Sequence, residues 1–111
     1  AAKAPGPDTR APVEPPKLEA TYASVNQFIF AKKCTACHSP QGQVPFVDLS
    51  TRFAIFKQRD YLLDFEKPDR SYILEVIQDP FEPMPPKDSP FDQLTDKEIK
   101  ILQKWIGLGM P

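Results

Sequence analysis

The stretch Cys34-Thr35-Ala36-Cys37-His38 decides how the rest of the sequence is interpreted. It contains both cysteines and the single histidine of the 111-residue chain. On one turn of helix, residues three and four positions apart lie on the same face. Two thiols at this spacing can each form a thioether with a vinyl group of a haem, and the neighbouring imidazole can then bind the iron. The motif therefore predicts one covalently attached haem, held by Cys34 and Cys37, with His38 as the proximal ligand.

Three other uses of the two cysteines are open but less favoured. A thioredoxin-like redox pair belongs near a βαβ pattern, and the sequence shows none. A zinc site needs four ligands, and here only carboxylates could complete it. A disulfide at this spacing would close too short a loop to stabilise the chain much.

The second axial ligand of a low-spin haem cannot be another histidine in this chain, and a methionine thioether is the usual alternative. Met84 lies between prolines, which restrict the backbone to extended conformations, so this segment would lose little entropy when it holds the thioether against a haem. Met110 is the penultimate residue, and because chain ends fray we expect its side chain to be exposed. Met84 is therefore the expected ligand, with a gap-filling core methionine as the alternative.

The apolar pattern predicts several helices and no strand, so the expected fold class is all-α. The first helix is expected over residues 24–35, with Ser24 as its N-cap. A turn-rich segment should follow over 39–48, then a short helical turn over 51–57 and a short helix over 71–78 that Pro80 ends.

The last helix has the clearest boundaries in the sequence. Thr95 and Glu98 form a capping-box pattern at its start. Apolar residues then recur at helical spacing up to Gly107 and Gly109, which end it. A haem packed between these helices would supply the large apolar core that about 90 residues otherwise lack.

The order of these features resembles class I cytochrome c, and in particular its short bacterial monohaem members. Those proteins have a C-x-x-C-H motif near the start, a Met-Pro-Pro ligand loop, and a final helix that ends in Trp-Ile and glycine. The matching segments here are Cys34 to His38, Met84-Pro85-Pro86, and Leu94 to Gly109. The resemblance implies a small cytochrome c fold with its helices packed around one haem c.

The resemblance also implies particular contacts. The first and last helices should cross, with Phe30 packed against Leu102 and Trp105. Asn26 stands where family members often have glycine, so either the helices lie further apart or Asn26 forms a hydrogen bond across the crossing. The carbonyl of Pro45 is the expected acceptor for the proximal histidine.

The expected function is electron transfer by this haem, with no enzymatic reaction, because no acid/base pair accompanies the motif. Two alternatives stay open: a haem module of a larger oxidoreductase complex, or a five-coordinate haem sensor or peroxidase-like site if Met84 is not bound. The expected partners are redox proteins, and a formal net charge of -1 gives no sign of nucleic acid binding. Four basic residues are expected to be ordinary surface cations, although they could flank the haem edge: Lys32, Lys33, Arg52 and Arg59.

Composition divides the chain into residues 1–20 and residues 21–111. The first segment lacks apolar periodicity and is expected to be a flexible linker or membrane tether, whereas the second is the monohaem domain. Five of the 14 prolines lie in the first segment: Pro5, Pro7, Pro12, Pro15 and Pro16. No apolar run reaches membrane-spanning length. Because members of the resembled family receive their haem outside the bacterial cytoplasm, the expected location is the periplasm, and the start at Ala1 fits a cleaved leader.

Overall fold

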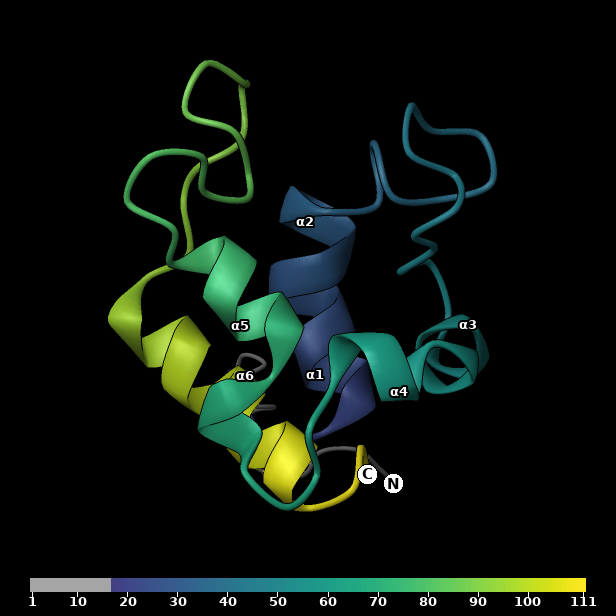
Figure 1. Cartoon of the computed structure of the whole chain (residues 1–111), viewed down its shortest axis with the longest axis vertical. Helices are drawn as coiled ribbons and strands as arrows, with labels where there is room; N and C mark the ends of the chain where they lie inside the picture. The colour runs from purple at the N-terminus through teal and green to yellow at the C-terminus, as the bar shows by residue number, and fades with distance from the viewer. Residues whose placement is uncertain (1–16) are drawn as a thin grey trace, which may run out of the picture.

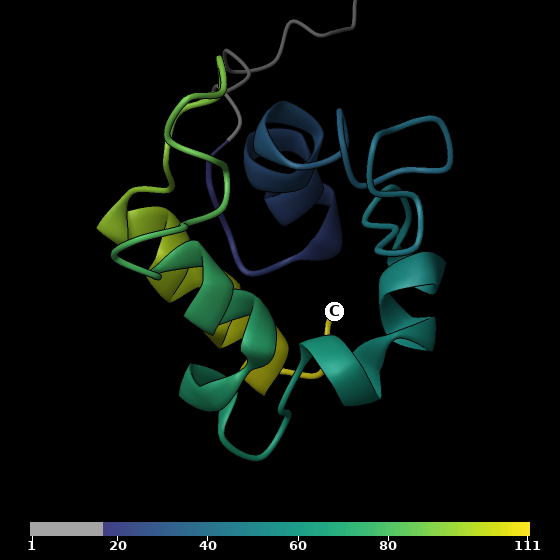
Figure 2. The same cartoon turned by 45° about the horizontal axis from the view of Figure 1, so that its top comes forward.

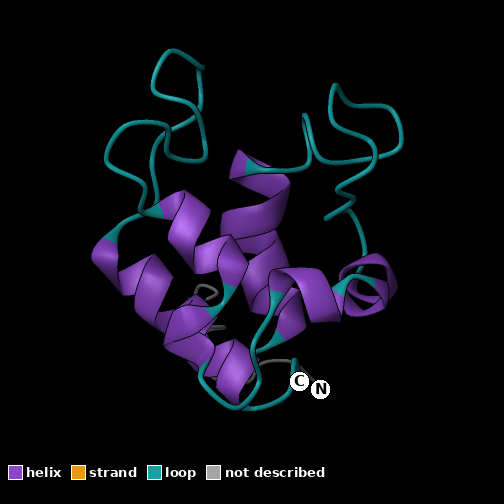
Figure 3. Cartoon of the chain, in the orientation of Figure 1, coloured by secondary structure: helices purple, strands orange, loops and turns teal. Residues whose placement is uncertain are grey.

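Residues 17–111 of the computed structural model are described here, and in this range helices are joined by loops (Figure 1). The loop after the first helix and the loop before the last helix lie on opposite sides of the first helix (Figure 2). No strand occurs in the described range (Figure 3), which confirms the predicted all-α class. None of the helices within it has the length and apolar character needed to cross a membrane. Most of the predicted linker, residues 1–16, lies outside the described residues.

The first helix begins earlier than predicted, because Thr21 and not Ser24 is its N-cap. The helix runs through three consecutive pieces, α1 (Tyr22–Val25), the π-helical η2 (Asn26–Phe30) and α2 (Ala31–Lys33). Thr21 has extended backbone angles, and its hydroxyl accepts a hydrogen bond from the Ser24 N–H at 3.3 Å. Ser24 is buried inside the first turn, where its hydroxyl donates to the carbonyl of Lys17 at 3.0 Å.

The middle of the chain forms short helices around the predicted positions. They are α3 (Arg52–Lys57), α4 (Arg59–Leu62), the 3₁₀-helix η3 (Pro68–Arg70) and α5 (Tyr72–Ile77). The predicted helices near 51–57 and 71–78 are confirmed, whereas α4 was not predicted. Gln58 separates α3 from α4, and its side-chain amide donates to the carbonyls of Asp48 and Ala54 at 2.8 and 2.9 Å.

The last helix, α6 (Asp96–Gly107), packs across the first helix as expected. Its capping box is confirmed, since Thr95 and Glu98 each bond the other's backbone N–H. The rings of Phe30 and Trp105 meet edge-on with centroids 5.9 Å apart, and both side chains are fully buried. Asn26 forms no side-chain hydrogen bond with any other described residue, so of the two alternatives for this position the structure does not show the bond across the crossing.

The expectation that Met110 is exposed is wrong, because its side chain is 0 % exposed and belongs to the hydrophobic core. Gly109 and Met110 both have positive φ angles, of 85° and 65°, which turn the chain back toward α6. The Met110 N–H donates to the carbonyl of Trp105 at 3.0 Å, and the carbonyl of Pro111 accepts the indole N–H of Trp105 at 3.2 Å. These contacts hold the end of the chain against the core.

Candidate functional site

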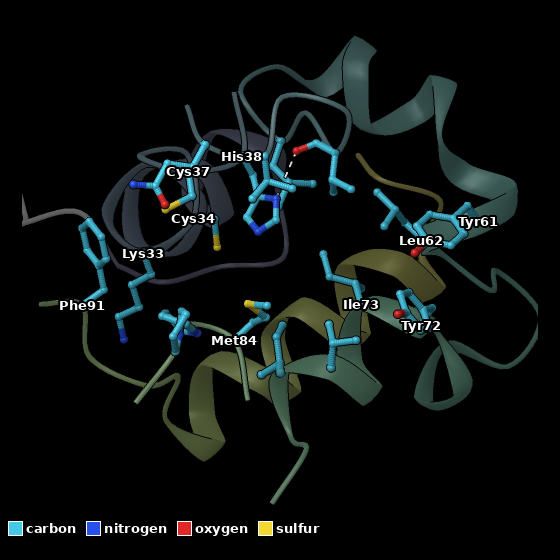
Figure 4. Close-up of a pocket in the computed structure, with 18 residues that line it drawn as sticks. Lys33, Cys34, Cys37, His38, Tyr61, Leu62, Tyr72, Ile73, Met84 and Phe91 are labelled. Carbon is cyan, nitrogen blue, oxygen red and sulfur yellow. Dashed lines mark hydrogen bonds between the residues drawn. The ribbon is translucent and has the colours of Figure 1, made fainter. Parts of the chain in front are cut away.

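The four residues predicted to hold a haem all line one pocket of about 320 Å³. Figure 4 shows His38 and Met84 projecting into it from opposite walls, with Cys34 and Cys37 beside His38. The rest of the lining is mainly apolar and includes Val44, Leu49, Leu62, Ile73, Val76 and Phe91. The structure therefore brings the four predicted residues together, although Cys34 and Met84 are 50 positions apart in the sequence.

The two cysteines lie on a turn that continues the first helix. The N–H groups of Cys34 and Thr35 both donate to the carbonyl of Phe30, and that of His38 donates to the carbonyl of Cys34 at 2.9 Å. Neither cysteine is in a disulfide. Burial raises the pKa of the Cys34 thiol to about 12. A thiol that stays protonated at neutral pH is a poor redox nucleophile, which argues against the thioredoxin-like alternative.

The imidazole of His38 is oriented by the carbonyl of Val47, which lies 3.2 Å from its Nδ1. The prediction that Pro45 is the acceptor is therefore wrong, because the acceptor lies two residues further along the chain. A neutral ring that donates from Nδ1 leaves Nε2 as the nitrogen available to a metal. Partial burial lowers the pKa of His38, and the bond to Val47 offsets only part of that effect. The ring is thus held in its neutral, ligating form at neutral pH.

The loop that supplies Val47 depends on Gly42. The N–H of Val44 donates to the carbonyl of Cys37 at 2.8 Å, and the N–H of Leu49 donates to that of His38 at 2.9 Å. A Cβ at Gly42 would overlap the Cys37 carbonyl, so only glycine allows this close approach. Sequence reasoning counted Gly42 among the residues that make this segment turn-rich, but it did not predict the close approach to Cys37.

Met84 reaches the pocket from the loop that follows α5. Its N–H donates to the carbonyl of Val76 at 3.0 Å, and its peptide bond to Pro85 is cis. The side chain is 39 % exposed, in contrast to the buried Met110, which does not line the pocket. Of the two methionines, only Met84 is therefore placed to face His38.

Sequence reasoning missed a polar cluster beside the pocket. The ammonium group of Lys33 donates to a carboxylate oxygen of Glu98 at 2.8 Å and to the backbone carbonyl of Gln93 at 3.1 Å. The side-chain amide of Gln93 in turn donates to the carbonyl of Pro85. Lys33 lines the pocket and is largely buried. No short motif in the sequence could have revealed these contacts, because Lys33 is 60 or more positions from both of its partners.

The ion pair between Lys33 and Glu98 should make stability depend on pH. Partial burial opposes ionisation of Glu98, but the hydrogen bonds from Lys33 and Thr95 outweigh it and lower its pKa. A carboxyl with a lowered pKa stabilises the fold above its unfolded pKa of about 4.3, and this contribution is lost as the pH falls through the folded value. We expect Glu98→Gln to lower the free energy of unfolding by up to about 1 kcal/mol at pH 7 and to have little effect near pH 3.

Urea denaturation at a series of pH values measures this difference. Glu75→Gln is the matched control, because Glu75 is an exposed glutamate on α5. An effect of Glu98→Gln that stays constant from pH 3 to pH 7 would contradict the assignment.

A model of a known protein family matches part of this chain. The family described as Planctomycete cytochrome C matches residues 34–88, a range that starts at the first cysteine and includes Met84. The match supports a cytochrome c-type family, which implies covalently bound haem c and haem-based electron transfer. The narrower class I monohaem type stays a prediction. Neither the curated proteins nor the solved structures gave a significant match.

Proposed function

We propose that this cytochrome c-type chain transfers single electrons with one haem, which Cys34 and Cys37 hold as thioethers and His38 and Met84 hold as axial ligands. The observation that carries the proposal is that these four side chains line the same apolar pocket. When bound, the haem supplies the one-electron chemistry. The proposal assigns no enzymatic reaction to the chain.

The donor set of the pocket fits this group better than it fits a bare metal ion. Two thiols, an imidazole and a thioether border walls that are otherwise mainly apolar. Among residues 17–111, no group of three or more His, Cys, Asp or Glu is placed to hold a metal ion. A flat apolar macrocycle would satisfy both the apolar walls and the soft sulfur ligand.

Each part of the chain has a separate task in this proposal. The helical turn at 34–38 presents the thiols and the imidazole on one side of the pocket. Val47 fixes the orientation of the His38 ring, which strengthens it as a ligand. The apolar walls restrict water near the bound group and so limit the reorganisation that accompanies a change of charge.

The expected partner is another redox protein that docks beside the pocket. Phe46 and Phe81 are 80 % and 86 % exposed, and they lie on the two loops that supply Val47 and Met84. Exposed aromatic side chains of this kind are typical contact residues of protein interfaces. We also propose a periplasmic location, because haem attachment to cysteines takes place outside the bacterial cytoplasm in the resembled family.

Mass spectrometry and a redox titration followed by absorption test the proposal together. The protein matured in cells competent for cytochrome assembly should exceed its polypeptide mass by one haem and titrate as a single one-electron couple. The Cys34→Ser, Cys37→Ser double variant should carry no covalent haem. A colourless protein with only its polypeptide mass would overturn the proposal. A high-spin ferric spectrum would instead favour the five-coordinate sensor or peroxidase-like alternative.

A further inference from the structure

The loop that carries Met84 is tied down at one point on each side of this residue. On one side, the Met84 N–H donates to Val76 in α5 at 3.0 Å. On the other side, the carbonyl of Pro85 accepts the side-chain amide of Gln93. The remaining hydrogen bonds of the described residues 85–92 stay within residues 80–91. Apart from the bond from Lys87 to the Pro80 carbonyl, which stays on the same loop, Gln93 is therefore the hydrogen-bonding link between residues 85–92 and the rest of the described structure.

Gln93 is itself held by the opposite side of the pocket. Its backbone carbonyl accepts from the ammonium group of Lys33 at 3.1 Å, and Lys33 directly precedes Cys34. Lys33 also forms the 2.8 Å ion pair with Glu98, and both side chains are largely buried, at 13 % and 14 % exposure. A shielded ion pair of this kind is held more firmly than an exposed one. Lys33 and Gln93 thus connect the wall that carries the cysteines to the loop that carries Met84.

We propose that Gln93 is a positioning residue that holds the Met84 loop against the pocket and so limits how readily the Met84 thioether leaves a bound haem iron. The inference rests on the proposed function, because it takes Met84 as an axial ligand. Gln93 does not line the pocket. It acts through Pro85, and Lys33 and Glu98 keep it in place.

Displacement of Met84 by imidazole is the most direct test. In ferric Gln93→Leu, imidazole should bind about fivefold more tightly than in the native protein, an effect of the size that one lost hydrogen bond produces. The matched control is Gln103→Leu, because Gln103 lies on α6 and forms no side-chain hydrogen bond with any other described residue. This control should leave the affinity for imidazole within about twofold of native.

Hydrogen exchange of peptides that contain Met84 tests whether Gln93 restrains the loop, and this measurement does not depend on iron ligation. Gln93→Leu should speed exchange of these peptides about fivefold relative to Gln103→Leu, with a similar urea midpoint in both variants. Gln93→Asn, whose shorter side chain cannot span the same distance, should act in the same direction and serves if the leucine variant does not fold. Exchange rates that match the control would overturn the proposal.

The experiment separates this inference from the proposed function. If the native ferric protein lacks the thioether-to-iron absorption band, the assignment of Met84 as a ligand fails, whereas the exchange data still decide whether Gln93 holds the loop. If the band is present and imidazole binds equally tightly to native and Gln93→Leu proteins, the positioning role fails although Met84 ligation stands.

Discussion

Met84→Ala should abolish the red thioether-to-iron absorption of the ferric protein and lower its reduction potential by on the order of 0.1 V. Met84 and His38 project from opposite walls of the pocket, and no second methionine lines it. A thioether favours ferrous iron because it is a soft, neutral ligand. The alanine variant loses this preference, and no other thioether lines the pocket to restore it.

The control for this experiment is Met110→Leu. Because Met110 belongs to the core and does not line the pocket, its replacement should leave both the absorption band and the reduction potential unchanged. Absorption spectra and potentiometric titration of the two variants measure both quantities. If Met84→Ala retains the absorption band, Met84 is not the ligand. If Met110→Leu loses the band, Met110 is the ligand instead.

Short-range chemistry explains why much of the site could be predicted from sequence. The spacing of Cys34, Cys37 and His38 fixes their relation within one helical turn, and the structure retains it. The capping box of Thr95 and Glu98 was predicted for the same reason, since both partners lie within four residues. The prolines beside Met84 indicated an extended loop, and that loop lies at the pocket.

Contacts that depend on how a loop folds back were predicted less well. The family resemblance implied Pro45 as the acceptor for His38. In the structure, the loop packs closely at Gly42 and brings the carbonyl of Val47 to the imidazole instead. At the first helix, Thr21 and Ser24 are both acceptable N-caps by residue type. In the structure, Thr21 has the extended backbone and forms the capping bond. The Ser24 hydroxyl instead bonds to the backbone of Lys17 and Glu19, which the preceding segment brings beside it.

The polar cluster beside the pocket was also not predicted, because its residues lie far apart in the sequence. Lys33 was expected to be an ordinary surface cation, yet it is largely buried against Glu98. The partners are 65 positions apart, and only the crossing of the first and last helices brings them together. A charged residue next to a cofactor motif therefore cannot be assigned a partner until the helix packing is known.

Met110→Ala should lower the free energy of unfolding by about 2–5 kcal/mol, the range for truncating a buried methionine. If the side chain of this penultimate residue were exposed, as the sequence suggested, the substitution would have almost no effect on the free energy of unfolding. In the structure, the side chain is fully buried in the same core as Trp105 and Phe30. The carbonyl of Met110 also accepts a hydrogen bond from Arg52 at 2.8 Å, which ties the end of the chain to α3.

Alanine is the informative substitution because it removes the buried side chain while it retains the backbone conformation and the backbone hydrogen bonds. Met110 has a φ of 65°, a conformation that costs any residue with a Cβ on the order of 1 kcal/mol, so alanine keeps that cost and loses the burial that offsets it. Met110→Leu keeps most of the buried volume and should cost less than about 1.5 kcal/mol. Urea denaturation of the two variants gives the comparison. If alanine and leucine destabilise the fold equally, the side chain of Met110 contributes nothing to the core, and only the backbone contacts hold the chain end in place.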